Sequence, residues 1–437
     1  MKFLIENMNK YLLLLLVVIS LSHSACSRNN NKNTSEFKEK PRVIVSSDIG
    51  GTDPDDFQSM IHFLMYADKF QVEGIIASPY GKGRKKDILH IIDLYEQDFP
   101  KLKQHGDFPS PEQLRLVTKQ GSAESSPAKG WGEHSEGSDW IIQQAKTESS
   151  RPLWILIWGG LDDLAQALHD SPEITPAIRV YWIGGPNKKW SVNSYHYIAT
   201  NFPDLWMIEN NSTYRGWIID DDASPEFKSY TFYENNIKGK GALGTDFSNY
   251  YGGSIKMGDS PSLAYLLNGK PDQPQAESWG GSFTRLPYSA FRRFNRNTIL
   301  SDTVPIYSLV TWTFDSGENI AASENPEIWI EIDGQQIDGF YAGDGIFKVR
   351  FIPKRIGSWK YVVNSPLKKL TGQTGEFVSV NPWPGPENSE NVKLNKWWSD
   401  RTDSDLYLGQ YQGARTVSRW REDFLSDWAK RFEWISD

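Results

Sequence analysis

The 437-residue sequence predicts an α/β fold with a mostly parallel sheet, together with a second domain built as a β-sandwich. Short apolar runs alternate with helical patterns over residues 42–267, and short strands without helices follow over residues 303–380. Helical spacing returns between Thr416 and Ile435. Since a domain usually contains about 100–200 residues, this length suggests two or three domains.

The expected strands of the first region are short and apolar. They are Val43–Ser47, Val72–Ala77, Pro152–Trp158, Ile178–Ile183 and Asp204–Ile208. Apolar residues recur at helical spacing between them, over residues 57–64 and 161–169. Strands that alternate with helices predict βαβ units and a parallel sheet. Such a sheet binds its ligands beyond the carboxyl ends of its strands.

The second region consists of short strands separated by turns. The expected strands are Val304–Phe314, Glu327–Asp333, Ile346–Phe351, Ser358–Val363 and Gly375–Val380. Over residues 347–351 apolar and basic side chains alternate, which is the period of a half-buried strand. Residues 301–382 are therefore expected to form an immunoglobulin-like β-sandwich.

Composition excludes several classes of protein. A content of 13% aromatic residues is incompatible with global disorder. The formal net charge of -8 argues against a nucleic-acid partner, because nucleic-acid binders usually present a basic face. Cys26 is the one cysteine in the sequence, so neither an intramolecular disulfide nor a thiolate zinc site can form.

The amino-terminal residues are typical of an export signal. Two lysines precede the apolar run Tyr11–Leu21, which is shorter than the roughly 20 residues of a transmembrane helix. Small residues then lead to Cys26, and the arrangement resembles a bacterial lipoprotein signal in which this cysteine carries the lipid. We expect a signal peptide over residues 1–25 and a flexible tether over residues 26–41. Plain secretion and an uncleaved membrane anchor are the alternatives.

An acidic loop carries the strongest chemical signal. Asp48, Asp53, Asp55 and Asp56 lie within nine residues, after an expected strand and before an expected helix. Carboxylates so close together repel one another unless they are solvated, protonated or bound to a cation. Oxygen ligands favour calcium or magnesium. An acidic helix start is the alternative, but the position at the carboxyl end of a strand favours a metal site.

This loop resembles the D-x-D-x-x-x-D-D cluster of nucleoside hydrolases. It is still more similar to the nucleoside-hydrolase-like domain of a bacterial family named for a cellulose-binding protein. Asp48 matches the second aspartate of the cluster, and Asp55 and Asp56 match its terminal pair. Ser46 stands in place of the first aspartate, and the spacing after Asp48 is longer than in true nucleoside hydrolases.

Three later segments extend the resemblance. The turn that contains Asp162 is similar to one whose backbone carbonyl ligates calcium in the family. The turn Ile183–Pro186 is also similar, and the segment after it places Asn193 at a sugar hydroxyl. Asp259 matches the aspartate of a late H-D motif, but Gly258 replaces the histidine that assists the leaving base.

The resemblance also implies a domain arrangement. Residues 42–300 would form a nucleoside-hydrolase-like, Rossmann-like domain. Residues 301–382 are similar to an accessory domain of bacterial glycoside hydrolases. Residues 383–437 would form a return segment and the closing helix of the first domain, because Arg419 to Trp434 resembles the closing helix of the hydrolase-like family. The sandwich would then be an insertion into the first domain.

The implied activity is metal-dependent hydrolysis of an N- or O-glycosidic bond. Asp48, Asp56, Asp259 and the carbonyl of Asp162 would bind calcium, with Asp48 also acting as general base.

The expected substrate contacts are Asp55, Asn193, Asn210 and Arg215, the last two in a polar loop that follows a strand. The expected partner is a carbohydrate or a nucleoside-like small molecule, with no nucleic acid and with membrane attachment through lipid alone. The protein would be exported, either as a cell-envelope lipoprotein or into the periplasm or extracellular space. Since Gly258 replaces the assisting histidine, the alternative is a non-catalytic carbohydrate-binding surface lipoprotein.

Overall fold

The computed structural model describes most of the chain beyond the amino-terminal segment. The described residues are 39–78, 84–318, 320 and 327–436. The expected signal peptide, Cys26 and nearly all of the expected tether lie outside them. From Lys40 onward the chain forms one compact unit. In the part that the structure describes, no helix has both the length and the apolar character needed to cross a membrane.

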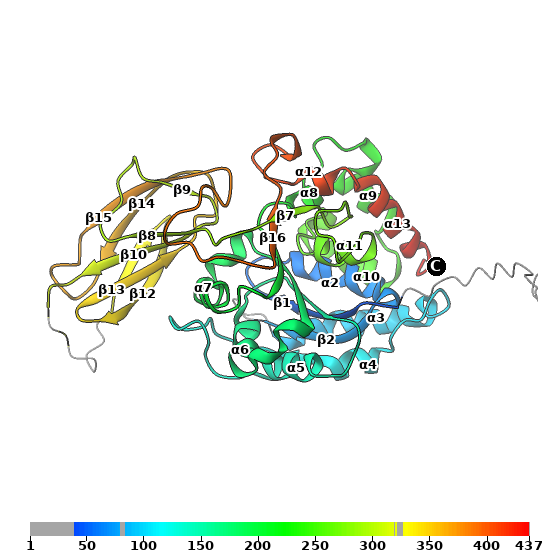
Figure 1. Cartoon of the computed structure of the whole chain (residues 1–437). Coiled ribbons are helices and arrows are strands. Elements are labelled where there is room, and N and C mark those ends of the chain that lie inside the picture. Colours follow the sequence, from blue (N-terminus) through cyan, green and yellow to red (C-terminus); the bar gives the residue numbers. More distant parts are fainter. Residues whose placement is uncertain (1–38, 79–83, 319, 321–326, 437) are drawn as a thin grey trace, which may run out of the picture. The chain divides into compact units, whose positions relative to one another are not determined.

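An eight-stranded sheet organises the first region (Figure 1). Its strand order is β3-β2-β1-β4-β5-β6-β16-β7, and every neighbouring pair is parallel except β16 and β7. The strands are β1 (Arg42–Ser47), β2 (Gln71–Ala77), β3 (Thr118–Gln120), β4 (Leu153–Ile157), β5 (Ile178–Ile183), β6 (Trp206–Asn210), β7 (Phe283–Arg285) and β16 (Trp397–Asp400). The predicted α/β fold with a mostly parallel sheet is confirmed.

Helices cover both faces of this sheet. They are α2 (Asp55–Met65), α3 (Lys85–Leu102), α4 (Pro111–Val117), α5 (Glu136–Ala145), α6 (Asp162–Asp170), α7 (Val192–Asn201), α8 (Arg215–Ile218), α9 (Ser229–Asn236), α10 (Gly241–Asp246), α11 (Ser260–Leu267), α12 (Arg415–Ser418) and α13 (Arg421–Glu433). Val43 and Val45 of β1 join the core formed with α2, α3, α11 and α13. Ile44 points to the opposite core, formed with α5, α6 and α7. The alternation follows from the two-residue period of a strand.

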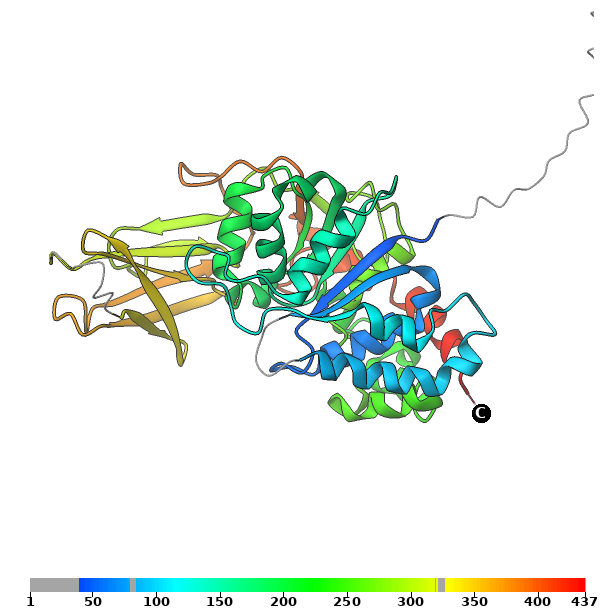
Figure 2. The same ribbon diagram turned by 90° about the horizontal axis from the view of Figure 1, so that it is seen from below.

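The last part of the chain returns to the first sheet. β16 lies between β6 and β7, and Trp397 within it is fully buried. Phe424, Trp428 and Phe432 recur every four residues along α13 and are buried in the same core as α2. The chain thus leaves this sheet after β7 and re-enters it more than a hundred residues later (Figure 2).

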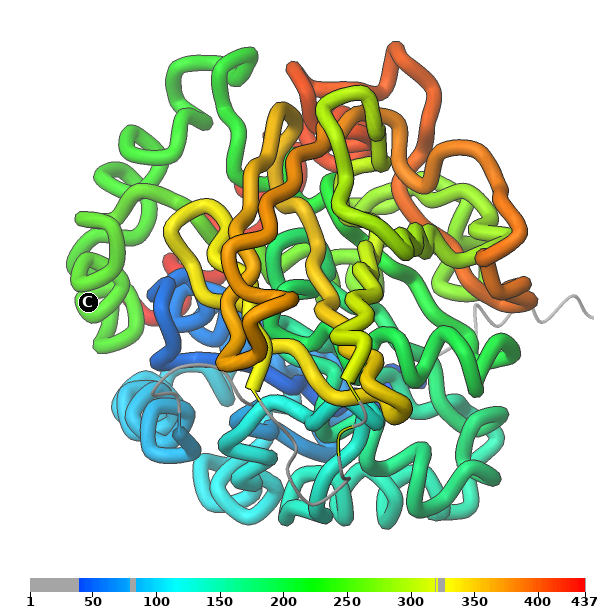
Figure 3. The backbone as a smooth tube through the Cα atoms, turned by 90° about the vertical axis from the view of Figure 1, so that its left-hand side faces the viewer, coloured from blue at the N-terminus to red at the C-terminus, as the bar shows by residue number. Residues whose placement is uncertain are grey.

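A second, mostly antiparallel set of eight strands occupies the intervening sequence (Figure 3). Its order is β8-β10-β13-β12-β11-β14-β15-β9, with parallel pairs only at β8–β10 and β9–β15. The strands are β8 (Phe291–Phe294), β9 (Thr303–Pro305), β10 (Leu309–Asp315), β11 (Trp329–Ile332), β12 (Gln335–Gly343), β13 (Ile346–Phe351), β14 (Gly357–Asn364) and β15 (Thr374–Val380). Trp312, Trp359 and Phe377 are buried in its core. The expected second β domain is therefore present, and its immunoglobulin-like character stays a prediction.

Two local expectations for this domain differ from the structure. The expected strand Val304–Phe314 is interrupted, because Tyr307 adopts a positive φ of 62° that breaks the extended run into β9 and β10. The domain also takes in β8, which precedes residue 301. β8 reads Phe-Arg-Arg-Phe, which does not alternate, so its pattern does not identify a strand from sequence.

Candidate functional site

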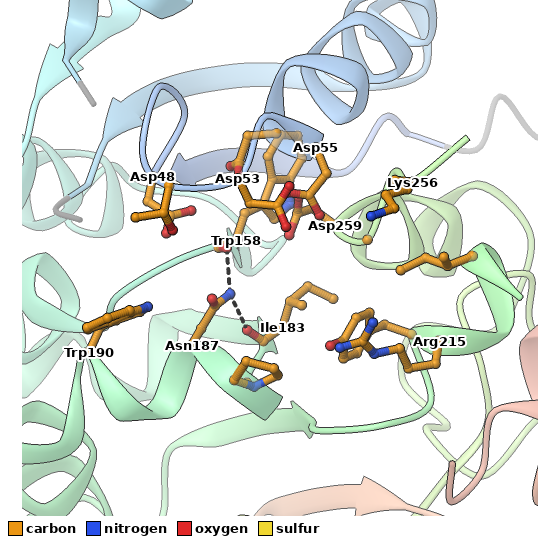
Figure 4. Close-up of a pocket in the computed structure, with 17 residues that line it drawn as sticks. Asp48, Asp53, Asp55, Trp158, Ile183, Asn187, Trp190, Arg215, Lys256 and Asp259 are labelled. Carbon is orange, nitrogen blue, oxygen red and sulfur yellow. Dashed lines mark hydrogen bonds between the residues drawn. The ribbon is translucent and has the colours of Figure 1, made fainter. Parts of the chain in front are cut away.

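Four carboxylates, with the exposed Asp53 beside them, converge beyond the carboxyl ends of the central strands (Figure 4). Asp48 follows β1 directly, and Asp55 and Asp56 are the first two residues of α2. Asp259 comes from the opposite end of the domain sequence, immediately before α11. One carboxylate oxygen from each of Asp55, Asp56 and Asp259 can be chosen such that the three atoms lie within 4.8 Å of one another. A loop and a distant helix start thus build one acidic cluster.

The buried, mutually repelling carboxylates of this cluster would be stabilised by a cation. Burial, and then the charges of neighbouring aspartates, raise the pKa of Asp55, Asp56 and Asp259 well above its usual range. Burial and the charge of Asp55 raise the pKa of Asp48 to about 7. The hydroxyl of Ser47 donates a hydrogen bond to Oδ1 of Asp56, which offsets part of the rise in the pKa of Asp56. A bound cation would favour the ionised form of all four carboxylates.

The donor set fits a hard divalent cation. Asp259 is 3% exposed, and its Oδ2 atom has no hydrogen-bond partner among the described residues. A buried polar atom without a partner is costly, and coordination to a cation would satisfy it. Carboxylate oxygens are the ligands that calcium and magnesium prefer. The cluster of Asp55, Asp56 and Asp259 therefore fits a metal site.

A cleft of about 150 Å³ separates the carboxylates from an opposite wall (Figure 4). Asn187, Trp190 and Arg215 lie on that wall, and Lys256 lies near Asp259. The cleft is thus acidic on one side, and on the other it offers an amide, an indole and a guanidinium. Hydroxyl groups and a ring face of a sugar match this combination.

Of the predicted site residues, five line this cleft and three do not. Those that line it are Asp48, Asp55, Asp56, Asp259 and Arg215. Asp162 is the first residue of α6 and is buried elsewhere. Its carboxylate accepts hydrogen bonds from the backbone N–H of Ser126 at 2.6 Å and from the hydroxyl of Ser194 at 3.0 Å. The expected role of its carbonyl as a calcium ligand stays a prediction.

The two predicted asparagine contacts are engaged by protein groups. Asn193 accepts a 2.8 Å hydrogen bond from Arg350 and donates one of 3.1 Å to the carbonyl of Ser126. Asn210 is fully buried and accepts a 2.9 Å hydrogen bond from the backbone N–H of Tyr214, a residue that lines the cleft. Asn210 is therefore placed to support the cleft wall, and its contact with substrate is untested, like that of Asn193.

Several residues of the opposite wall were not predicted from the sequence. Asn187 directly follows the turn Ile183–Pro186, and Trp190 comes three residues later. The turn therefore pointed to this segment, but the sugar contact expected from it was Asn193. Lys256 had no signal in the sequence pattern. Asn187 lies in the 3₁₀ segment Gly185–Lys189 that follows β5, and Trp190 comes directly after that segment.

Gly258, which stands where the resembling motif has a histidine, lies against the acidic cluster. A Cβ atom at Gly258 would lie 3.0 Å from Oδ2 of Asp55, so a side chain there would crowd the acidic cluster. No histidine lines the cleft among the described residues. His196 is stacked on Phe291 instead, and His62 is buried in the core.

Comparison with family models gives two matches. Residues 42–283, more than half of the chain, match the model described as the cellulose-binding Sde182, nucleoside hydrolase-like domain. Residues 303–366 match a domain of unknown function, DUF5060. No curated protein matches the chain.

Several solved structures resemble the chain at low identity. A nucleoside hydrolase-related hypothetical protein from Saccharophagus degradans, associated with carbohydrate metabolism, is 20% identical with a TM-score of 0.48; the match covers 78% of this chain and 99% of that one. The purine-preferring ribonucleoside hydrolase of Gardnerella vaginalis is 13% identical over 56% of this chain and 83% of its own, with a TM-score of 0.37. The inosine-uridine preferring nucleoside hydrolase of Bacillus anthracis is 11% identical over 90% and 99%, with a TM-score of 0.36.

Proposed function

The chain belongs to the family of the cellulose-binding Sde182, nucleoside hydrolase-like domain, and from this premise we propose that it is an exported, metal-dependent hydrolase of a glycosidic bond. The substrate would be a carbohydrate or a nucleoside-like molecule. One observation carries the proposal: Asp55, Asp56 and Asp259 converge in a cleft, and Oδ2 of Asp259 has no partner among the described residues.

Calcium is the cation that we propose for this site. Asp55, Asp56 and Asp259 would hold it, and the adjacent Asp48 lies in the same cleft. When bound, the ion would supply positive charge that orients sugar hydroxyls and makes a water molecule more acidic. The proposal moves Asp55 from the expected substrate contacts to the ligands, because its carboxylate belongs to the cluster.

The other groups of the cleft would position the sugar and move a proton. Asp48 would accept the proton of the attacking water, as a general base within reach of the carboxylate cluster. Arg215 would donate hydrogen bonds to sugar oxygens from the opposite wall, and the Oδ1 atom of Asn187 would accept one from a sugar hydroxyl, since its amide hydrogens are both engaged. Trp190 would offer its ring face to the sugar. The bond from the anomeric carbon to the leaving group breaks as the bond to the water oxygen forms.

A second function is favoured by a specific observation. The described residues place no histidine in the cleft, and Gly258 occupies the position that resembles the assisting histidine of nucleoside hydrolases. A leaving group that needs a proton would then depart slowly. The alternative is a non-catalytic carbohydrate-binding surface lipoprotein, which would keep the metal site and use it to bind sugar.

Calorimetric titration of calcium into the chelator-stripped protein tests the proposal. We expect one ion per chain, with binding lost in Asp56→Asn. Asp221→Asn is the matched control, because it removes a carboxylate from an exposed acidic run far from the cluster in sequence. The absence of binding at millimolar calcium would contradict the metal-dependent mechanism.

A screen of nucleosides and glycosides then separates the two functions. Hydrolysis that requires calcium and is lost in Asp48→Asn supports the enzyme. Sugar binding in the presence of calcium without any turnover supports the non-catalytic alternative.

A further inference from the structure

A second cavity lies on the other side of Arg215. It has a volume of about 100 Å³, and Arg215 lines both this cavity and the acidic cleft. The remaining wall comes from the return segment, including Trp383 and Tyr411, and from Lys354 and Arg355 between β13 and β14. We call this cavity the basic pocket. It places cations of the β domain beside the cleft of the α/β domain.

Positive charge is in excess in the basic pocket. Among the described residues, no carboxylate lies within ion-pair distance of Lys354 or Arg215, whereas Arg355 pairs with Asp333 at 3.1 Å. Lys189 lies close to Lys354, and burial, followed by the charge of Lys354, lowers the pKa of Lys189 to about 8. Lys189 lies outside the pocket lining, but two like charges held so close repel each other, and an anion beside Lys354 would relieve the repulsion.

One residue of the pocket lining, Trp383, carries a buried hydrogen-bond donor without an acceptor in the described part of the chain, and the lining also holds one carboxylate. Trp383 is 1% exposed, and its Nε1–H group has no partner among the described residues. Asp400 is the one acidic residue of the lining, and its two oxygens accept hydrogen bonds from the backbone N–H groups of Asn211 at 3.2 Å and Thr213 at 3.1 Å. Burial raises the pKa of Asp400 to about 7. The pocket thus holds Lys354 and Arg215 without ion-pair partners among the described residues, while its carboxylate is already engaged.

We propose that the basic pocket binds an anionic group of an acidic carbohydrate whose neighbouring sugar occupies the acidic cleft. The anion would be a carboxylate, as in a uronic acid, or a sulfate ester. Lys354 and Arg215 supply charge, and Tyr411 supplies an aromatic surface. This proposal rests on the proposed function, since it assigns the sugar to the acidic cleft, and it extends that function to a substrate class.

Three disaccharides that differ at a single position test the proposal. They are cellobiose, cellobiouronic acid, in which the non-reducing C6 is a carboxylate, and cellobiose 6′-sulfate. Their dissociation constants are measured by calorimetry on the full chain at saturating calcium. One charged contact of this kind changes affinity by about tenfold or more, so we expect at least one anionic disaccharide to bind about tenfold more tightly than cellobiose. The anionic disaccharide that binds more tightly shows whether the pocket prefers a carboxylate or a sulfate ester.

Substitutions assign the preference to the pocket. Lys354→Gln should remove the roughly tenfold preference while leaving the affinity for cellobiose unchanged, and Lys354→Arg should retain it. Lys360→Gln is the matched control, because its side chain is 81% exposed on β14 and lies outside the pocket lining. Thermal melting of each variant verifies that it is folded.

Specific results overturn the proposal. They are equal affinity for all three disaccharides, no binding of any of them at millimolar concentration, or an equal loss for cellobiose and the anionic disaccharides in Lys354→Gln. Calcium binding by the same preparations is measured separately. A protein that binds calcium but shows no anion preference refutes the basic pocket alone, whereas a preference that survives without calcium binding refutes the metal-dependent function alone.

Discussion

The side-chain amide of Asn187 donates a 2.8 Å hydrogen bond to the carbonyl oxygen of Trp158. The same amide donates a 3.1 Å hydrogen bond to the carbonyl of Ile183. Trp158 follows β4 and Ile183 ends β5, so one side chain ties together the loops beyond two neighbouring strands (Figure 4). The position of Asn187 on the wall that faces the carboxylates therefore depends on the carboxyl ends of both strands being correctly placed relative to each other.

Asn187→Ala tests the importance of this contact for the cleft. We expect a loss of about 1–3 kcal/mol in the free energy of unfolding, because two hydrogen bonds are removed and two carbonyls lose a donor. Cellobiose affinity should fall as well, since the wall loses its amide. Urea unfolding and calorimetry measure the two effects. Asn201→Ala is the control, since Asn201 donates one exposed 2.8 Å hydrogen bond to Tyr197; a similar loss there would contradict the assignment.

Asp259→Asn should have opposite effects with and without calcium. Without calcium the variant should melt at a higher temperature than the wild type, because one of several buried, mutually repelling carboxylates is removed. With calcium at about 100 times its dissociation constant, the wild type should gain about 2.7 kcal/mol, and the variant should gain almost nothing. Differential scanning calorimetry measures both. A variant stabilised by calcium as strongly as the wild type would remove Asp259 from the site.

His62 should make the protein sensitive to acid. Burial, and then the charge of Arg431, lower the pKa of this histidine to about 3, from an ordinary value of 6.5. Because its pKa is depressed in the folded state, the stability that its neutral form contributes is present above pH 6.5 and is lost as the pH falls towards 3. Between pH 7 and pH 5 the free energy of unfolding should drop by about 2 kcal/mol from this group alone.

Urea unfolding at the two pH values, compared with His62→Gln, isolates this contribution. The glutamine variant should be less stable at pH 7, because the ring packs against Tyr66 and Trp428. Its stability should nevertheless change by about 2 kcal/mol less between the two pH values. An unchanged pH dependence in the variant would show that other groups cause the acid sensitivity.

Gly216→Ala tests the docking of the return segment on the first domain. Gly216 lies in α8, and a Cβ atom there would come 1.9 Å from the carbonyl oxygen of Ala414, just before α12. The segments must separate to accept it, so we expect a loss of about 1–3 kcal/mol in the free energy of unfolding. Gly132→Ala is the control, since its nearest neighbour is Pro127 at 3.7 Å. Chemical denaturation of both variants measures the difference, and equal stability would contradict the docking.

The return segment also bears on the expected domain arrangement, which we keep as a proposal. β16 is paired with β6 and β7, so a chain that ends at residue 300 lacks a strand of the first sheet and all of α13. We expect such a truncated chain to fail to fold, as judged by circular dichroism and by rapid proteolysis. A folded, protease-resistant fragment would show instead that residues 42–300 are an independent domain.

Local sequence patterns were sufficient to predict the fold class and the acidic loop. The strand and helix periods of the first region and the alternation along β13 depend on neighbours a few residues apart, which a sequence displays directly. Asp48, Asp55 and Asp56 could be assigned together because one short loop carries all three. Asp259 was found through a motif resemblance, and the structure brings it to the same cluster.

Contacts between distant segments decided the rest. Arg350 on β13 occupies the amide oxygen of Asn193, and Asn210 supports Tyr214 instead of lining the cleft. The spacing of residues along the chain predicts neither contact, because each partner lies in another element. The direction of a side chain also depends on the residues that pack against it. The sequence by itself determined the alternation of strands and helices, the later run of short strands, and the segment in which the carboxylates begin. Only the tertiary structure decided which side chains face them, since that depends on how the strands and loops are brought together.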